Sequence, residues 1–368
     1  MGCSRDVKMR ITSLAAKSYG WVGNIISKIE KPYSLLYYII EHANWSIKWD
    51  GKYITENLNN LRLIRARTTT VHFGIKNQII HFGSANTFLD SKSFKKPHKF
   101  NKVVLTWFHV VPEDPRIRFA NETQKYVDVV HTSTPITRKK LIEIGIPEEK
   151  IVVIPLGVDL NLFKPVSFEE KQKLREKIDI PKDKIIIGSF QKDGVGWGEG
   201  LEPKWVKGPD IFVKVVDELK KDYDIFVLLL GPARGYVKSE LEKRGIFYKH
   251  IFLKNYLEIP KYYNALDLYL VTSREEGGPK AVLEAMATGI PLVSTKVGMA
   301  PEIIKEGYNG FLAEVDDVEM LAEKAMKILD EEKLAKEMVE NGLETVRDYS
   351  WEEIATRYYE RIYRRFLK

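Results

Sequence analysis

Cysteine is almost absent from this sequence of 368 residues, because Cys3 is the only one. A single cysteine excludes an intramolecular disulfide, a Cys-x-x-Cys redox pair and a zinc site built from cysteines. Long apolar runs are missing too: the best two, at 34–40 and 225–230, fall far short of the roughly 18 residues that span a bilayer. The first ten residues are polar, so we expect no secretory signal and a cytoplasmic protein.

The charge is distributed unevenly along the chain. Residues 1–165 hold 25 Lys and Arg against 14 Asp and Glu, so the net charge of +7 arises entirely there and the rest is slightly acidic. This excess fits either a solvated surface or attraction to an anionic partner, such as a phosphorylated acceptor or an anionic membrane face that the protein contacts peripherally. No signature of an RNA- or DNA-binding module is present, so we expect no nucleic-acid partner.

Short β-rich runs alternate with longer helical patterns, which predicts parallel sheets built from βα units. We expect strands at 45–49, 79–82, 103–108, 127–132, 151–155, 184–190, 224–230, 251–253, 266–271, 291–294 and 310–313. We expect helices at 34–42, 53–61, 137–145, 209–221, 237–244, 279–288, 318–329 and 332–346. Glycine and prolines near 156–165 interrupt the pattern and mark a domain boundary.

The predicted architecture is α/β, with two doubly wound Rossmann-like domains that face each other across a cleft. The first covers residues 1–160 and the second covers 161–345. Residues 346–368 form a terminal helix that carries large apolar side chains on one side: Trp351, Ile354, Tyr358, Ile362 and Phe366. The default active site of such a protein is the cleft between the domains.

The segment after the predicted strand 266–271 carries the strongest chemical signal. Pro279 suits the first position of a helix, and the turn before it contains Gly277 and Gly278, which let a ligand approach the backbone. Helix-start amides attract phosphate. Glu284 lies one helical turn beyond Lys280, and its carboxylate can accept two hydrogen bonds from a ribose diol.

Two further residues belong to the same candidate site. Glu276 precedes the turn and can reach a sugar hydroxyl. Lys207 comes just before a second Gly-Pro helix start, which places a cation beside another set of helix-start amides. Two anion-attracting helix starts in one domain suggest a diphosphate between them. The structural alternative for each of these residues is an ordinary solvated side chain on a strand–turn–helix unit.

In this context the sequence resembles the retaining glycosyltransferases of family 4, which have the two-Rossmann GT-B fold. The resemblance rests on Glu276 and Glu284 in an S-x-x-E-G-x-P-x-x-x-x-E-A-M-A setting and covers roughly residues 100–365. Further segments agree in the same order along the chain: 129–133, 154–159, 163–165, 263–267 and 349–351.

The resemblance implies a role for each matching residue. Glu284 would bind the nucleotide ribose, Glu276 would hold the transferred sugar, and Lys207 would neutralise the leaving diphosphate. His109 matches the family histidine near the sugar. The remaining donor-binding residues would be Gly51, Ser189, Lys192, Gly277, Gly278, Pro279 and Lys280, with Gly51 on a short loop before a helix.

The sequence departs from the family pattern after the first strand of the second domain. The family has a Gly-Arg pair there, whereas this chain reads Gly188-Ser189-Phe190-Gln191-Lys192. Lys192 is the nearest cation, but a point charge does not reproduce the planar arginine fork. The following loop at 193–205 lacks the Gly-Lys-Ser/Thr ending of a P-loop, which excludes a P-loop nucleotide triphosphatase. We interpret it as a mobile lid.

We therefore expect a metal-independent hexosyltransferase that needs no cofactor. It would transfer a sugar with retention from a UDP- or GDP-sugar to a glycan, lipid-linked or small-molecule acceptor. The alternatives are a GT-B epimerase or hydrolase of nucleotide sugars, or a non-enzymatic polyanion binder that uses the basic first half. The sequence does not distinguish between donors or between acceptors.

Overall fold

The computed structural model divides the chain into two compact units. Unit 1 comprises residues 1–154 together with 351–368, and unit 2 comprises residues 155–350. The structure describes residues 32–42, 46–89, 93–111, 114–253 and 255–367. Cys3, the first ten residues and Trp45 lie outside these ranges. No helix in the described part of the chain is both long enough and apolar enough to cross a membrane.

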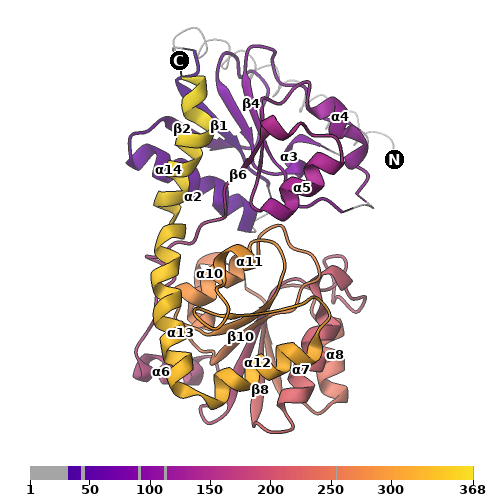
Figure 1. Ribbon diagram of the computed structural model, residues 1–368, viewed down its shortest axis with the longest axis vertical. Helices are drawn as coiled ribbons and strands as arrows, with labels where there is room; N and C mark the ends of the chain where they lie inside the picture. The colour runs from indigo at the N-terminus through magenta and orange to yellow at the C-terminus, as the bar shows by residue number, and fades with distance from the viewer. Residues whose placement is uncertain (1–31, 43–45, 90–92, 112–113, 254, 368) are drawn as a thin grey trace, which may run out of the picture. The chain divides into compact units, whose positions relative to one another are not determined.

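Unit 1 contains a six-stranded parallel sheet with helices on both faces (Figure 1). Its strands, in spatial order, are β2 (Arg65–Thr69), β1 (Leu35–Ile39), β3 (Ile79–Phe82), β4 (Lys102–Thr106), β5 (Val129–Thr132) and β6 (Ile151–Val153). Its helices are α2 (Ser46–Asn60), α3 (Ala85–Phe88), α4 (Ala120–Thr123), α5 (Pro135–Glu143) and α14 (Trp351–Tyr358). Single turns are η1 (Ile117–Phe119), η2 (Glu148–Lys150), η6 (Tyr359–Tyr363) and η7 (Arg364–Phe366).

Unit 2 contains a second six-stranded parallel sheet. Its strands, in spatial order, are β12 (Phe311–Ala313), β11 (Leu292–Thr295), β10 (Leu268–Val271), β7 (Ile185–Phe190), β8 (Ile225–Leu230) and β9 (Tyr248–Ile251). Its longer helices are α6 (Phe168–Lys177), α7 (Pro209–Leu219), α8 (Gly235–Lys243), α10 (Lys280–Ala287), α12 (Val318–Asp330) and α13 (Glu332–Thr345). Shorter elements are α9 (Ile259–Tyr263), α11 (Ala300–Ile303), η3 (Trp205–Lys207), η4 (Tyr256–Glu258) and η5 (Val346–Tyr349).

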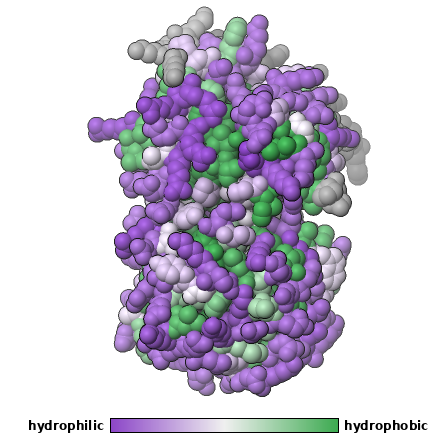
Figure 2. Space-filling view, viewed as in Figure 1, coloured by the Kyte–Doolittle hydropathy of each residue, from purple (hydrophilic) through white to green (hydrophobic). Residues whose placement is uncertain are grey.

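The two strand orders make both units doubly wound. In unit 2 the first strand, β7, lies between β8 and β10, which is the Rossmann order. In unit 1 the first strand, β1, lies between β2 and β3. The predicted fold class of two Rossmann-like domains is therefore confirmed. Hydrophilic residues cover most of the visible surface of each unit (Figure 2), whereas the apolar side chains are buried on both faces of the sheets.

Two element predictions in the first half are wrong. The predicted helix at 34–42 is strand β1, and the predicted strand at 45–49 overlaps the start of helix α2. A parallel strand buried on both faces reads as a continuous apolar run, which periodicity cannot distinguish from a buried helix. Strand β2 and helix α6 were not predicted, and the strand expected at 251–253 is β9, which ends at Ile251.

The loop predicted at Gly51 is wrong. Gly51 lies inside α2, not on a loop before a helix. A side chain there would put its Cβ 2.6 Å from Cγ2 of Ile40 and 2.7 Å from Cδ1 of Tyr38. The missing side chain therefore allows α2 to pack closely against the end of β1.

The terminal segment of the chain, residues 351–368, belongs to unit 1, and the apolar side that its periodicity predicts packs there. All five apolar side chains predicted on one side of this segment are buried. Helix α14, yellow in Figure 1, contacts α2. The rings of Trp351 and Tyr53 stack there with centroids 5.5 Å apart.

A buried polar network links this segment to the sheet. The Oγ1 atom of Thr106 lies 2.7 Å from Nε2 of His81 and 2.9 Å from Nδ1 of His131. The hydroxyl of Tyr363 lies 2.6 Å from Nδ1 of His81, and that of Tyr358 lies 3.0 Å from Nε2 of His131. Burial lowers the pKa of His131 to about 4 and that of His81 well below its usual value. Both rings are therefore neutral at pH 7.

This network predicts a loss of stability in mild acid. Between about pH 6.5 and pH 4 the unfolded chain binds a proton at His131 that the folded chain does not, so the free energy of unfolding falls as the pH falls. His131 alone should account for about 3 kcal/mol. Urea unfolding between pH 7 and pH 4.5 should show a shallower pH dependence in His131→Gln. An unchanged dependence in His131→Gln would contradict the assignment.

Candidate active site

The candidate site lies at the carboxyl edge of the unit 2 sheet, where the strand order changes direction. Strands β7 and β10 are neighbours there, although β8 and β9 lie between them in the chain. Ligands of doubly wound sheets bind outside the carboxyl ends at this point. The segments that follow the two strands lead into η3 and α7 on one side and into α10 on the other. These segments contain nearly all the predicted donor-binding residues.

Lys207 and Glu276 contact each other directly. The Nζ atom of Lys207 lies 2.6 Å from Oε1 of Glu276, and the Ser273 hydroxyl donates to the same oxygen over 2.8 Å. The Lys207 side chain is 18% exposed and that of Glu276 is 11% exposed, so both are largely withdrawn from water. The structure thus brings together a cation and a carboxylate that are 69 residues apart in the sequence.

Arg274 joins the two segments and was not predicted. Its backbone N–H donates to the carbonyl of Val206 over 2.9 Å, and its Nη1 donates to the carbonyl of Trp205 over 2.8 Å. Its guanidinium also forms a bidentate ion pair with Asp210 in the first turn of α7, at 2.8 Å for each bond. Such a pair fixes geometry as well as charge. Arg274 therefore holds the Lys207 turn against the Glu276 loop.

The start of α7 requires glycine. Gly208 has a φ of 59°, and a Cβ atom there would lie 1.8 Å from the carbonyl oxygen of Thr272. The Thr272 hydroxyl donates to the Gly208 carbonyl over 3.0 Å. This close approach brings the first turn of α7 against the end of β10, as expected for a glycine that lacks a side chain to separate them.

Helix α10 begins one residue later than predicted. Pro279 is its N-cap, with a ψ of 94°, and Lys280 is the first helical residue. The preceding Gly277 is buried and Gly278 is half-buried. The amide of Val282, the third residue of α10, donates to the Pro279 carbonyl over 3.0 Å. Anion binding at this start and at that of α7 stays a prediction from the general character of helix starts.

Glu284 lies in the second turn of α10 and is 7% exposed. Two tyrosines hold its carboxylate: the Tyr256 hydroxyl donates to Oε1 over 2.7 Å and the Tyr263 hydroxyl donates to Oε2 over 3.0 Å. Burial, followed by the interactions with Tyr269 and then Glu284, raises the pKa of Tyr263 well above its usual value. The Lys280 ammonium lies over the Tyr256 ring, 5.4 Å from its centroid. Tyr263 falls in a segment that the resemblance marks, whereas no sequence signal identified Tyr256.

A buried arginine supports the loop after β7. Arg234 is fully buried, and its Nη1 donates to the carbonyls of Ser189 over 2.6 Å and of Leu230 over 2.8 Å. Its Nη2 donates to the Ser189 hydroxyl over 3.0 Å, and its Nε lies 2.9 Å from Oδ1 of the buried Asp193. Arg234 therefore holds Ser189 in place and is not exposed to a ligand.

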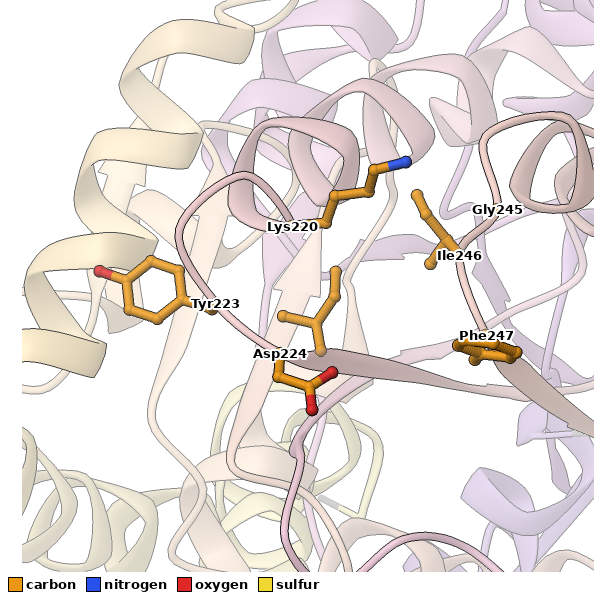
Figure 3. A pocket seen from close by; sticks show the side chains of 7 residues that line it. Lys220, Tyr223, Asp224, Gly245, Ile246 and Phe247 are labelled. Atoms are coloured by element: carbon orange, nitrogen blue, oxygen red, sulfur yellow. The ribbon is translucent and has the colours of Figure 1, made fainter.

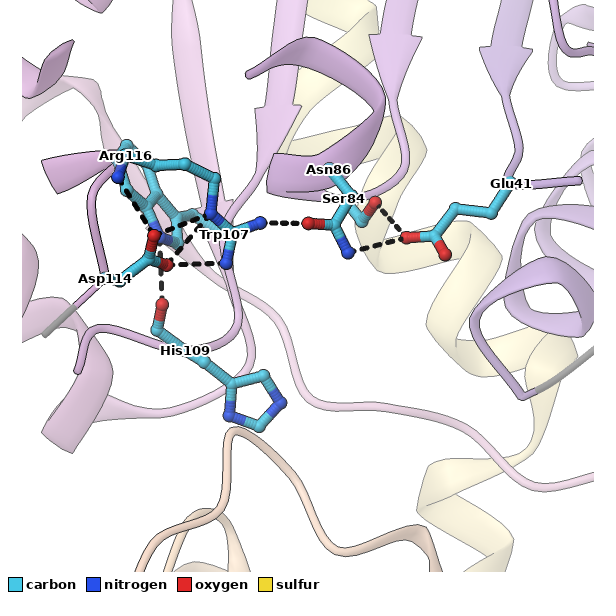
Figure 4. A network of polar contacts seen from close by, with 7 residues as sticks. All are labelled: Glu41, Ser84, Asn86, Trp107, His109, Asp114 and Arg116. Atoms are coloured by element: carbon cyan, nitrogen blue, oxygen red, sulfur yellow. Dashed lines mark hydrogen bonds and ion pairs between the residues drawn. The ribbon is translucent and has the colours of Figure 1, made fainter. Parts of the chain in front are cut away.

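Lys192 and His109 are placed differently from the other predicted residues. The Lys192 ammonium lies 4.4 Å from the centroid of the Trp197 ring, on the loop after β7. His109 belongs to unit 1, where its side chain is exposed and its carbonyl accepts a hydrogen bond from Trp107 Nε1 over 2.9 Å. In Figure 4 its imidazole points away from the neighbouring polar side chains.

Those polar side chains form a network at the carboxyl edge of unit 1, where β1 and β3 adjoin (Figure 4). Glu41 follows β1, and its Oε1 accepts hydrogen bonds from the Ser84 hydroxyl over 2.5 Å and from Asn86 Nδ2 over 3.4 Å. Arg116 donates to Asn86 through Nη1 and to Asp114 through Nε over 2.8 Å. The sequence analysis assigned no role to these residues.

A pocket of about 210 Å³ in unit 2 lies elsewhere, at the amino ends of β8 and β9 (Figure 3). It is lined by Lys220, Tyr223, Asp224, Ile225, Gly245, Ile246 and Phe247. Because ligands of such sheets bind at the carboxyl ends, this pocket is not part of the candidate site. The described residues contain no group of three or more His, Cys, Asp or Glu side chains that could hold a metal ion.

The sequence match to a known protein family covers the segment of unit 2 that contains the candidate site. Residues 201–345 match the family model for glycosyl transferases group 1. They include Lys207, Glu276 and Glu284. An uncharacterized glycosyltransferase of Methanocaldococcus jannaschii is 34% identical over 151 residues, which are 40% of this chain and 41% of the relative. A lipopolysaccharide core biosynthesis mannosyltransferase of Rhizobium meliloti is 28% identical over 201 residues, 52% of this chain and 54% of the relative. The chain thus spans about half the length of the curated relatives it matches.

Solved structures show the likeness across both units. The Anabaena protein HepE, crystallised with UDP and glucose, has a TM-score of 0.72 at 18% identity, over 89% of this chain and 98% of that one. A glycosyltransferase of Rickettsia africae has a TM-score of 0.69 at 19% identity, over 92% and 100% of the two chains. At these identities the likeness shows the fold, which is GT-B.

Proposed function

We propose that this protein is a retaining glycosyltransferase, similar to those of family 4, that transfers a hexosyl group from a UDP- or GDP-sugar. The observation that carries the proposal is the Lys207–Glu276 contact at the change of strand order in unit 2, within the segment that matches the glycosyl transferases group 1 model. The binding of UDP and glucose by the structurally similar Anabaena protein supports this class of donor.

The diphosphate would lie at the amino ends of α7 and α10, with the ribose on Glu284. The ribose hydroxyls would bind the Glu284 carboxylate, which offers about four acceptor positions and accepts bonds from Tyr256 and Tyr263. As the sugar–oxygen bond breaks, negative charge grows on the leaving diphosphate. Lys207 and the helix-start amides would stabilise that charge where it develops. Glu276 would hold a hydroxyl of the transferred sugar.

Retention would follow from attack of the acceptor on the face that the diphosphate leaves. In that geometry a phosphate oxygen takes the acceptor's proton, so no protein base is needed. We propose that the acceptor is a glycan and that its hydroxyls bind at the carboxyl edge of unit 1, where the Glu41 carboxylate and the Asn86 amide present acceptors and donors. His109 stays a candidate for contact with the sugar.

A thermal-shift screen tests the donor site. One of UDP, GDP or ADP should raise the melting temperature, because a ligand that binds only the folded state stabilises it. In Glu284→Gln that increase should largely disappear, since the amide oxygen carries no charge and its NH₂ group cannot accept the ribose hydroxyls. An increase of parental size in Glu284→Gln would contradict the ribose assignment.

Product analysis with the nucleotide sugar that binds, with and without EDTA, tests the reaction. We expect sugar transfer that EDTA does not inhibit. Release of nucleoside diphosphate with no glycosylated product, whatever acceptor is supplied, would indicate a hydrolase. Conversion of the donor into its isomer would indicate an epimerase.

A further inference from the structure

The loop between β7 and η3, residues 193–204, is a closed hairpin-like excursion. Gly194 and Pro203 form an antiparallel bridge. The N–H of Lys204 donates to the carbonyl of Asp193 over 2.7 Å. The loop therefore returns to the point where it left, and its last residue, Lys204, directly precedes the turn that carries Lys207.

The loop is also fixed to its surroundings. The carbonyl of Glu199 accepts from the first amide of α8, at Gly235, over 2.7 Å, and that of Gly200 accepts from the next amide over 2.9 Å. Gly200 has a φ of 77°, and a Cβ there would lie 2.3 Å from the carbonyl oxygen of Ala233. Movement of the whole loop as a lid would break these bonds. The backbone thus sets the position of Lys204.

Three lysines gather at this place. The N–H of Lys207 donates to the carbonyl of Lys204 over 2.8 Å, so the two residues lie one tight turn apart. Lys192 precedes the other end of the loop. Burial, and then the charges of Lys207 and Lys192, lower the pKa of Lys204, whereas Glu276 acts in the opposite direction. Lys207, Lys192 and Glu276 are therefore all close enough to act on the ammonium group of Lys204.

The positive charge of this group exceeds its negative charge. Glu276 pairs with Lys207. Within the described residues, the ammonium group of Lys204 donates no hydrogen bond and forms no ion pair. Gathering like charges beside the largely buried Lys207 costs free energy, which a bound polyanion offsets, and the exposed Lys204 side chain is accessible to such a ligand. Glu276 balances one of the three lysine charges. The two that remain equal in number the two negative charges on the diphosphate of a nucleotide sugar.

We propose that Lys204 is a third cation of the diphosphate site, presented by the 193–204 loop beside Lys207 and Lys192. This inference rests on the proposed function. Arg234 is buried and bonded to backbone carbonyls, so it does not supply a cation to a ligand. Lys204 and Lys192 would add two point charges to that of Lys207.

Nucleotide binding by charge-neutral variants tests the role of Lys204. Lys204→Gln should weaken binding of the preferred nucleoside diphosphate about tenfold, because one charge-assisted contact is lost. It should weaken binding of the nucleoside monophosphate less and leave the nucleoside unchanged. Lys204→Arg should restore most of the affinity. The control Lys182→Gln removes the same charge from an exposed pair with Glu176 and should bind like the parental protein.

The outcomes separate this inference from the proposed function. Parental diphosphate affinity in Lys204→Gln, with a loss in Lys207→Gln, would overturn the role of Lys204 alone. An equal loss for diphosphate and nucleoside in Lys204→Gln would also overturn it, because the change would then act through the fold. If the parental protein bound neither the nucleoside diphosphates nor inorganic pyrophosphate, both proposals would fail.

Discussion

Replacing Glu276 by glutamine should reduce sugar transfer about a hundredfold to a thousandfold, the range typical of losing one preorganised electrostatic contact in an active site. Glu276 accepts from both Lys207 and Ser273, so its charge orients the cation that we propose stabilises the leaving diphosphate. Glutamine keeps the size of the side chain but removes this charge. Turnover should therefore fall while the fold is retained.

The same substitution should not weaken binding of the nucleoside diphosphate. Lys207 would lose its carboxylate partner and become fully available to phosphate, so the affinity should stay the same or rise slightly. Release of nucleoside diphosphate from the nucleotide sugar measures the rate, and calorimetric titration measures the affinity. Glu275→Gln makes the same chemical change one residue away and should keep the parental rate. A parental rate in Glu276→Gln would remove Glu276 from the mechanism.

Replacing Arg234 by methionine should destabilise the protein by about 3–5 kcal/mol, the cost of leaving a buried charge without its partner. Asp193 is 1% exposed and lies 2.9 Å from Arg234, and burial raises its pKa against the opposing effect of the arginine. Without the guanidinium, the carboxylate would lose its ion pair. The carbonyls of Ser189 and Leu230 would lose their donor.

Urea unfolding measures this effect. Arg244→Met is the matched control, because Arg244 forms partly exposed ion pairs with Glu240 and Asp217 and should contribute less than Arg234 does. In the Arg234→Met background, Asp193→Asn should lower the free energy of unfolding less than it does in the parental protein. The Asp193 carboxylate has already lost its partner in that background, so removing its charge breaks no ion pair. A change of less than about 1 kcal/mol in Arg234→Met would show that the pair does not hold the loop after β7.

The sequence was more informative about unit 2 than about unit 1, for a physical reason. Strand β8 is a short apolar run bounded by Asp224 and Gly231, so its length and flanks identify it. Strand β1 is equally apolar but follows Pro32, which also suits a helix start. Periodicity carried no information there, because both faces of β1 are buried.

The sequence predicted those site residues whose positions follow from the local sequence pattern around helix starts. Glu276, Glu284 and Lys207 lie at fixed offsets from glycine–proline helix starts, so local sequence identified them. Arg234 could not be identified in this way, because arginine is rarely buried and its partner Asp193 comes from a loop 41 residues earlier. Lys204 was missed because only the return of its loop to Asp193 brings it beside Lys207.

A crystal structure of the complex with the nucleoside diphosphate that binds tests the central claim most directly. The account predicts phosphates at the amino ends of α7 and α10, within hydrogen-bond distance of Lys207, and both ribose hydroxyls on the Glu284 carboxylate. A nucleotide bound in the pocket near Phe247, or one that contacts Lys207 while its ribose lies away from Glu284, would contradict it.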